Sequence, residues 1–113
     1  MADKKLILLV DDDPDFVEAV RVIVENGGYE VEVAYDGQEG LEAVAERTPD
    51  LIVLDIMLPD INGKEVCQRV RKDPSLPDVK IICISGMVEQ DKVQDLRDAG
   101  ADDFMQKPFT VEA

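Results

Sequence analysis

The chain has 113 residues, enough for one domain with a substantial hydrophobic core. Its 26 acidic and 12 basic residues give a net charge of −14, which argues against direct binding of nucleic acid. Without histidine, the chain cannot use imidazole as a base, metal ligand or phosphate carrier. The apolar run 6–10 is too short for a membrane span or a signal sequence. The scattered Cys67 and Cys83 are expected to be core thiols of a cytoplasmic protein.

The first half of the chain predicts two strand–helix pairs. Residues 6–10 are wholly apolar, as in a buried strand, and Asp13 then caps a helix that opens at Pro14. Its buried stripe would be Phe16, Val20, Ile23 and Val24, and Gly27-Gly28 would end it. Residues 31–35 predict a second strand, nearer a sheet edge because their alternation is partial. Asp36 and Glu39 predict a capping box, which opens a helix with three inward residues: Leu41, Val44 and Ala45.

The second half repeats the alternation. Residues 51–54 are apolar and too few for a helix, so they predict a buried strand that ends at Asp55. Pro59 and Asn62-Gly63 break the chain before a helix over 62–71, with Val66 and Val70 inward. A strand over 79–84 ends at Ser85. A helix over 89–98 then has Val93 and Leu96 inward, and a short strand covers 103–106.

Five strands alternating with four helices predict an α/β fold with a parallel sheet and helices on both faces. Because the carboxyl ends of parallel strands share one edge, that edge would collect Asp11, Asp12, Asp55, Ser85 and Lys107. Three carboxylates so close would need a cation, or one of them would have to keep a proton. Ligation by oxygen alone favours Mg²⁺, and a lysine and a hydroxyl beside it suit a phosphoryl group.

An aspartate in this setting can act as a nucleophile and form an aspartyl-phosphate, and Asp55 is the candidate. Each residue alone has a simpler explanation: the acids 11–13 as a helix cap, Asp55 and Ser85-Gly86 as turn residues, Lys107 as surface, Phe104 as core. The joint pattern, with a functional group at four strand ends, favours the site over these separate explanations.

These residues resemble the receiver domain of bacterial two-component response regulators. The resemblance rests on four segments, at 10–14, 54–63, 84–86 and 107–109, and covers almost the whole chain. It implies a flavodoxin-like (CheY-like) three-layer sandwich with strand order 2-1-3-4-5. It also implies Asp55 as phosphoacceptor. Asp12 and the Met57 backbone carbonyl would ligate Mg²⁺ together with Asp55, and Asp11 would act through water.

The resemblance further implies that Lys107 and Ser85 contact the phosphoryl oxygens, and that Ser85 and Phe104 act as the switch. The Lys107-Pro108 bond would be cis. Two departures concern single residues: Gly86 stands where the family more often has alanine, and Phe104 lacks a tyrosine hydroxyl.

The third departure concerns the end of the chain. The family usually has a fifth helix, of which residues 110–113 supply barely one turn. Residues 1–113 are therefore expected to form a single receiver domain, truncated after the fifth strand. We expect an apolar patch there, with self-association or low stability, or an origin in a longer protein.

The leading functional hypothesis is a switch, not a turnover enzyme, that takes a phosphoryl group onto Asp55 from a sensor histidine kinase or phosphotransfer protein. A homodimer through the fourth helix and fifth strand, and an effector domain beyond Ala113, are further expectations; no membrane partner is expected. One alternative is an adaptor that works without phosphorylation. The other is an Asp-nucleophile phosphatase, but Met57 stands where such enzymes have a general acid.

Overall fold

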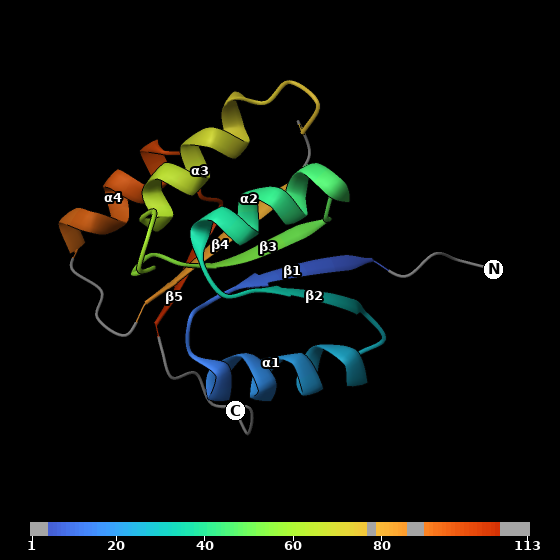
Figure 1. Cartoon of the computed structure of the whole chain (residues 1–113). Coiled ribbons are helices and arrows are strands. Elements are labelled where there is room, and N and C mark those ends of the chain that lie inside the picture. The colour runs from blue at the N-terminus through green and yellow to red at the C-terminus, as the bar shows by residue number, and fades with distance from the viewer. Residues whose placement is uncertain (1–4, 77–78, 86–89, 107–113) are drawn as a thin grey trace.

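A five-stranded parallel sheet forms the centre of the computed structural model, which describes residues 5–76, 79–85 and 90–106. Its strands are β1 (Leu6–Val10), β2 (Glu30–Ala34), β3 (Leu51–Asp55), β4 (Lys80–Ser85) and β5 (Asp103–Gln106). They lie in the order β2-β1-β3-β4-β5, as predicted (Figure 1). The three central strands, β1, β3 and β4, have few polar side chains along their length, which suits burial between two layers of helices.

Helices cover both faces of this sheet. The helix α1 (Pro14–Asn26) packs on one face, where Val17 and Val20 meet Leu9 of β1. On the other face lie α2 (Gly37–Glu46), α3 (Gly63–Lys72) and α4 (Gln90–Asp98) (Figure 1). Their buried residues join those of the strands in a larger core cluster. The described elements therefore form the expected three layers.

Short polar side chains fix where the helices begin. The Asp13 carboxylate accepts from the backbone N–H groups of Asp15 and Phe16, and Asn62 Oδ1 accepts from Glu65 N at 2.9 Å. Asp36 accepts from Glu39 N at 2.7 Å, as a capping box requires. In a capping box the Glu39 carboxylate would accept in return from the N–H of Asp36. Here it accepts from the N–H of Tyr35, one residue earlier.

Two predicted buried residues face solvent instead. Ile23 is 39% exposed because the buried stripe of α1 is centred on Val17 and Val20, and Ile23 lies beyond its margin. Ala45 is exposed, and Ala43 packs against the core in its place. The strand β2 begins and ends one residue earlier than predicted. The predicted core roles of Val66, Val70 and Leu96 are confirmed, and so is the left-handed end of α1, where Gly28 has φ 93°.

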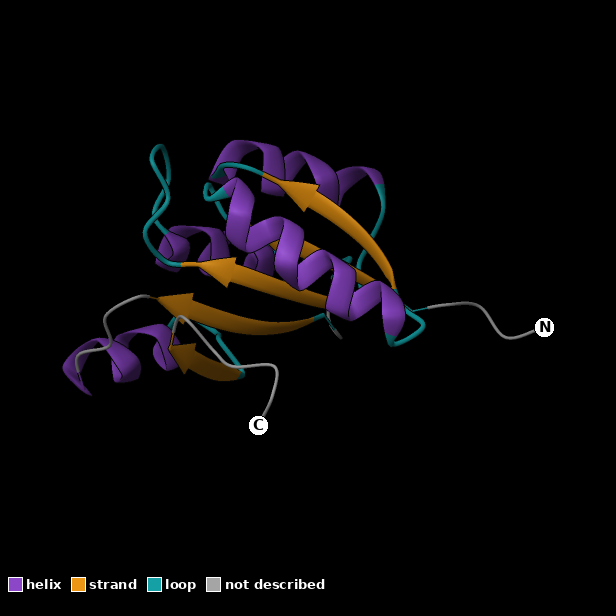
Figure 2. Ribbon diagram, turned by 90° about the horizontal axis from the view of Figure 1, so that it is seen from below, coloured by secondary structure: helices purple, strands orange, loops and turns teal. Residues whose placement is uncertain are grey.

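All five strands are parallel and end at the same edge of the sheet, toward which the arrowheads visible in Figure 2 point. The register places the end of β1 beside that of β3, and the end of β3 beside that of β4. Within the described residues, no helix is long and apolar enough to cross a membrane. Some expectations fall outside the described residues and stay predictions. They concern Gly86, the Val93 side chain, and the chain after residue 106, which includes Lys107 and the Lys107-Pro108 bond.

Candidate functional site

Three carboxylates meet at the carboxyl edge of the sheet. Asp11 and Asp12 follow β1, and Asp55 is the last residue of the neighbouring β3. One carboxylate oxygen from each residue lies within 4.8 Å of the others. Asp11 is 0% exposed and Asp55 4% exposed, whereas Asp12 is exposed. The structure therefore withdraws two acidic side chains from water and opens the group to solvent through the third.

Backbone hydrogen bonds orient the two buried carboxylates. Asp11 Oδ1 accepts from Asp13 N at 2.9 Å, and Asp55 Oδ1 accepts from Met57 N at 2.9 Å. The backbone of Asp11 is itself held, since its N–H donates to the Ala34 carbonyl of β2 at 3.0 Å. These bonds set the carboxylates before any ligand arrives, although the negative charges repel one another.

The chemistry of this donor set fits a hard cation. All three ligand atoms are carboxylate oxygens, which Mg²⁺ prefers, and the chain has no histidine to favour a softer metal. A divalent cation between the three side chains would offset their repulsion. The exposed Asp12 leaves a side of the group open, where Mg²⁺ could keep waters or meet a substrate oxygen.

The other predicted site residues lie on the next strands. Ser85 ends β4 and is 0% exposed, one residue beyond Ile84, which pairs with Asp55. The backbone N–H of Ile56 donates to the Ile84 carbonyl at 3.1 Å and holds the two strand ends together. Phe104 is half-buried on β5, opposite Cys83, on the side of the sheet that α3 and α4 cover. The structure thus places Ser85 beside the acid group and Phe104 one strand farther.

Sequence reasoning missed Asp60, which anchors the loop between β3 and α3. Its two carboxylate oxygens accept from Gly37 N at 2.8 Å and from Gln38 N at 2.9 Å, at the start of α2. Desolvation raises the pKa of Asp60, but the backbone N–H groups of Gln38 and Gly37 outweigh it and lower the pKa. An acid that binds a helix N-terminus can be predicted from sequence only when it lies within a few residues of that helix. Asp60 is 23 residues from Gly37, so no local pattern indicated the contact.

Gly63 lets the same loop turn back tightly against the site. A Cβ atom at this position would lie 2.6 Å from the Cα of Ile56 and 2.9 Å from the carbonyl oxygen of Asp55. Its backbone N–H donates to the Ile56 carbonyl at 3.1 Å. The sequence predicted a turn at Asn62-Gly63, and the structure adds that the turn must pack against backbone where no side chain fits.

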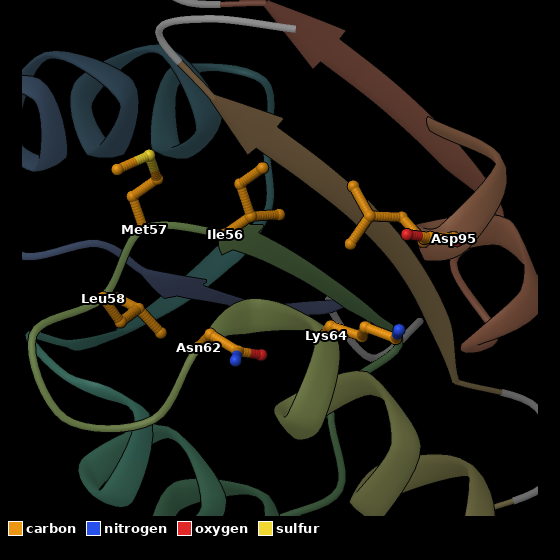
Figure 3. Close-up of a pocket in the computed structure, with 7 residues that line it drawn as sticks. Ile56, Met57, Leu58, Asn62, Lys64 and Asp95 are labelled. Carbon is orange, nitrogen blue, oxygen red and sulfur yellow. The ribbon is translucent and has the colours of Figure 1, made fainter. Parts of the chain in front are cut away.

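A pocket of about 420 Å³ opens beside the acid group, between this loop and α4 (Figure 3). Its lining comes from the loop and the start of α3 on one side and from α4 on the other: Ile56, Met57, Leu58, Asn62, Lys64, Asp95 and Leu96. Met57 is the most exposed of the large apolar residues described, at 69%. The exposed Met57 thus lines this pocket two residues after the buried Asp55.

The profile of the response regulator receiver domain matches residues 7–113. The chain belongs to this family. RpaA of Synechocystis sp., a DNA-binding dual master transcriptional regulator, is 43% identical over 107 residues, which are 94% of this chain and 44% of RpaA. The response regulator ArlR of Staphylococcus saprophyticus is 42% identical over 106 residues, 94% of this chain and 47% of ArlR.

Solved structures of receiver domains agree with this fold. A CheY-like response regulator receiver domain protein from Methanospirillum hungatei is 34% identical with a TM-score of 0.89, over 96% of this chain and 85% of that one. Chemotaxis protein CheY4 of Vibrio cholerae is 29% identical with a TM-score of 0.92, over 97% and 92%. The receiver chain spans less than half the length of the curated relatives just named.

Proposed function

We propose that this receiver domain is a switch that accepts a phosphoryl group on Asp55 in a Mg²⁺-dependent reaction. One observation carries the proposal: Asp11, Asp12 and Asp55 gather within 4.8 Å, and Asp55 is held by a backbone N–H at the end of β3. A structural cap would need neither the crowding nor the burial of these charges. A phosphoryl-transfer site needs both a nucleophile and negative ligands for a cation.

In the proposed reaction, the Asp55 carboxylate attacks the phosphorus of a phosphohistidine. An O–P bond forms, the P–N bond breaks, and the imidazole nitrogen keeps the electron pair. Asp12, Asp55 and the Met57 carbonyl would hold Mg²⁺ directly, and Asp11 would hold it through water. The cation supplies charge neutralisation at the phosphoryl oxygens. Ser85 and Lys107 would donate to those oxygens, and Ser85 with Phe104 would report the phosphorylated state.

Met57 distinguishes the switch from a phosphatase. A phosphatase with an aspartate nucleophile needs a general acid within hydrogen-bond reach of the leaving group. The side chain two residues after Asp55 is a thioether that is 69% exposed and cannot donate a proton. We therefore propose self-phosphorylation and slow self-dephosphorylation without turnover of an external substrate. An adaptor that works without phosphorylation would have no need of the acid group.

The proposed partners follow from the same site and from the charge. A sensor histidine kinase or phosphotransfer protein would supply the phosphoryl group, in the cytoplasm. A homodimer through α4 and β5, or an effector domain beyond Ala113, would receive the signal. RpaA is named as DNA-binding, but the net charge of −14 favours a receiver that does not itself touch DNA.

Acetyl phosphate and Mg²⁺ provide the test, because they remove the need for a known kinase. Intact mass spectrometry should show one phosphoryl adduct, absent with EDTA and absent in Asp55→Asn. The matched control is Asp13→Asn, which removes an acid of the same run that lies outside the group of three and still caps α1.

Each other outcome has a definite meaning. An unmodified Asp55 under these conditions would leave the adaptor as the better explanation. Rapid hydrolysis of phosphomonoesters, with many turnovers per protein, would favour the phosphatase. An adduct that survives in Asp55→Asn would move the phosphoacceptor elsewhere and overturn the assignment.

A further inference from the structure

Two cysteine side chains meet in the core between α3 and β4. Cys67 lies in α3 and Cys83 in β4, and both are 0% exposed. Their Sγ atoms are 3.7 Å apart, within hydrogen-bond distance for sulfur. The sequence predicted two core thiols, and their burial is confirmed, but their separation by 16 residues gave no sign of this contact.

The two thiols differ in how readily they lose a proton. The hydrogen bond from Cys83 lowers the pKa of Cys67 against the opposing effect of burial, and the charge of Arg71 lowers it further. The contact with Cys67 raises the pKa of Cys83, and burial adds to this. We take Cys67 as the thiol that attacks first, because the nearby Arg71 charge favours its thiolate, which is the reactive form.

We propose that Cys67 and Cys83 are a redox pair that closes to a reversible disulfide with a peroxide as oxidant. The Cys67 thiolate attacks one peroxide oxygen, the O–O bond breaks, and hydroxide leaves; Cys67 is then a sulfenic acid. The Cys83 thiol attacks the Cys67 sulfur, the S–O bond breaks, and a second hydroxide leaves with the Cys83 proton. The two sulfurs together lose two electrons, and the two thiol protons and the two hydroxides form two waters.

The bond would tie α3 to the strand that ends in Ser85. Cys83 pairs with Leu54 on one side, directly before Asp55, and with Phe104 on the other. The link would also close the chain between positions 67 and 83, which restricts the unfolded state and raises the Tm. Because both thiols are buried, oxidation goes through local opening and is slower than for an exposed thiol. The redox pair does not depend on phosphoryl transfer at Asp55.

Hydrogen peroxide on the folded chain tests this inference. After alkylation of free thiols and trypsin digestion without reductant, peptides 65–69 and 81–92 should appear joined, in a monomer lighter by two hydrogen atoms. Dithiothreitol should reverse the change. The oxidised protein should also have a Tm higher by about 5 °C or more.

Three results would overturn the proposal: two free thiols after prolonged peroxide, a link only between separate chains, or a link that forms only when urea has first unfolded the protein. Cys83→Ala is the control, since it keeps Cys67 but cannot close the bond. It should show no joined peptides and no rise in Tm on oxidation. The wild-type comparison of folded and urea-treated protein is decisive even if this variant folds poorly.

Discussion

The acidic residues at the amino edge and at the carboxyl edge of the sheet have opposite surroundings. At the amino edge, the Asp102 carboxylate accepts from the backbone N–H of Ile81 at 2.9 Å and from the Arg71 guanidinium at 2.6 Å. At the carboxyl edge, Asp11, Asp12 and Asp55 face one another. The same residue type holds the fold together where its neighbours are donors, and it forms the crowded group proposed to bind a cation where its neighbours are other acids.

Arg71 shows how completely the amino edge is organised. Besides the pair with Asp102, its guanidinium donates to the Gly100 carbonyl at 2.9 Å and to the Val79 carbonyl at 2.6 Å. One side chain of α3 thus joins the start of β4 to the turn before β5. At the carboxyl edge we expect the opposite, because the three carboxylates repel one another unless a cation binds, as proposed above.

The largest expected effect is on stability at the amino edge. Arg71→Met should lower the free energy of unfolding by about 2–4 kcal/mol, since the Gly100 and Val79 carbonyls lose the guanidinium as donor and Asp102 keeps only the Ile81 N–H. Mg²⁺ affinity should stay within about twofold of the wild type, because additivity holds between distant sites. Urea unfolding and Mg²⁺ titration measure the two quantities.

Arg69→Met is the matched control on the same helix. Arg69 pairs with Glu65 on the surface, with 52% of its side chain exposed, so the loss should be at most about 0.5 kcal/mol. Equal losses in the two variants would mean that Arg71 acts only as a surface charge, and the contrast between the edges would fail.

The second largest expected effect is a loss of Mg²⁺ binding at the carboxyl edge. The substitution concerned should stabilise the metal-free protein, whereas Arg71→Met should destabilise it. Asp12→Asn should weaken Mg²⁺ binding by about 10-fold or more, while the variant becomes more resistant to urea than the wild type in EDTA. Removing one of three crowded charges relieves repulsion, so affinity falls as the metal-free protein gains stability. Urea midpoints with and without Mg²⁺ measure both changes.

Asp13→Asn separates this effect from a general loss of negative charge. It removes the neighbouring charge but keeps a capping side chain on α1. It should therefore change the Mg²⁺ affinity and the urea midpoint in EDTA only slightly. If metal-free Asp12→Asn were less stable than the wild type, repulsion among the three carboxylates would not be lowering the stability of the protein. The two edges would then not differ in the way described above.

The sequence carried far more information about strands and caps than about contacts across the fold. Apolar runs and the caps Asp13 and Asp36 placed most elements within a residue or two, because they are local signals. The acid group was predictable because every parallel strand ends at one edge. The rotation of α1 about its own axis determines whether Ile23 is exposed, and it depends on which side chains pack against the sheet. The periodicity of apolar residues alone could not predict that rotation.

Three contacts were beyond reach for the same reason. The three donations by Arg71, the meeting of Cys67 with Cys83, and the hold of Asp60 on α2 all join residues whose proximity exists only after the chain has folded. Each of these residues also fits an ordinary place in a helix, a strand or a turn. Only the tertiary arrangement distinguishes them from their neighbours.

The smallest expected effect tests an acid that lies between the two extremes. Asp60 is at the carboxyl edge, yet backbone donors from α2 hold it, as donors hold the acids of the amino edge. Because the pKa of Asp60 is lowered from its ordinary 3.8, its contribution to stability is present above that pH. The contribution disappears as the pH falls through the lower pKa of the folded state.

Asp60→Asn should therefore lower the urea midpoint slightly at neutral pH, because an amide keeps one acceptor oxygen and loses the charge. The difference from the wild type should begin to shrink as the pH approaches 3.8 and disappear below the lowered pKa of the folded state. Glu42→Gln, an exposed change on α2, should show no such convergence. A difference that is constant with pH would mean that the Asp60 charge adds nothing to the hydrogen bonds, and that the loop is held by its packing and by Gly63 alone.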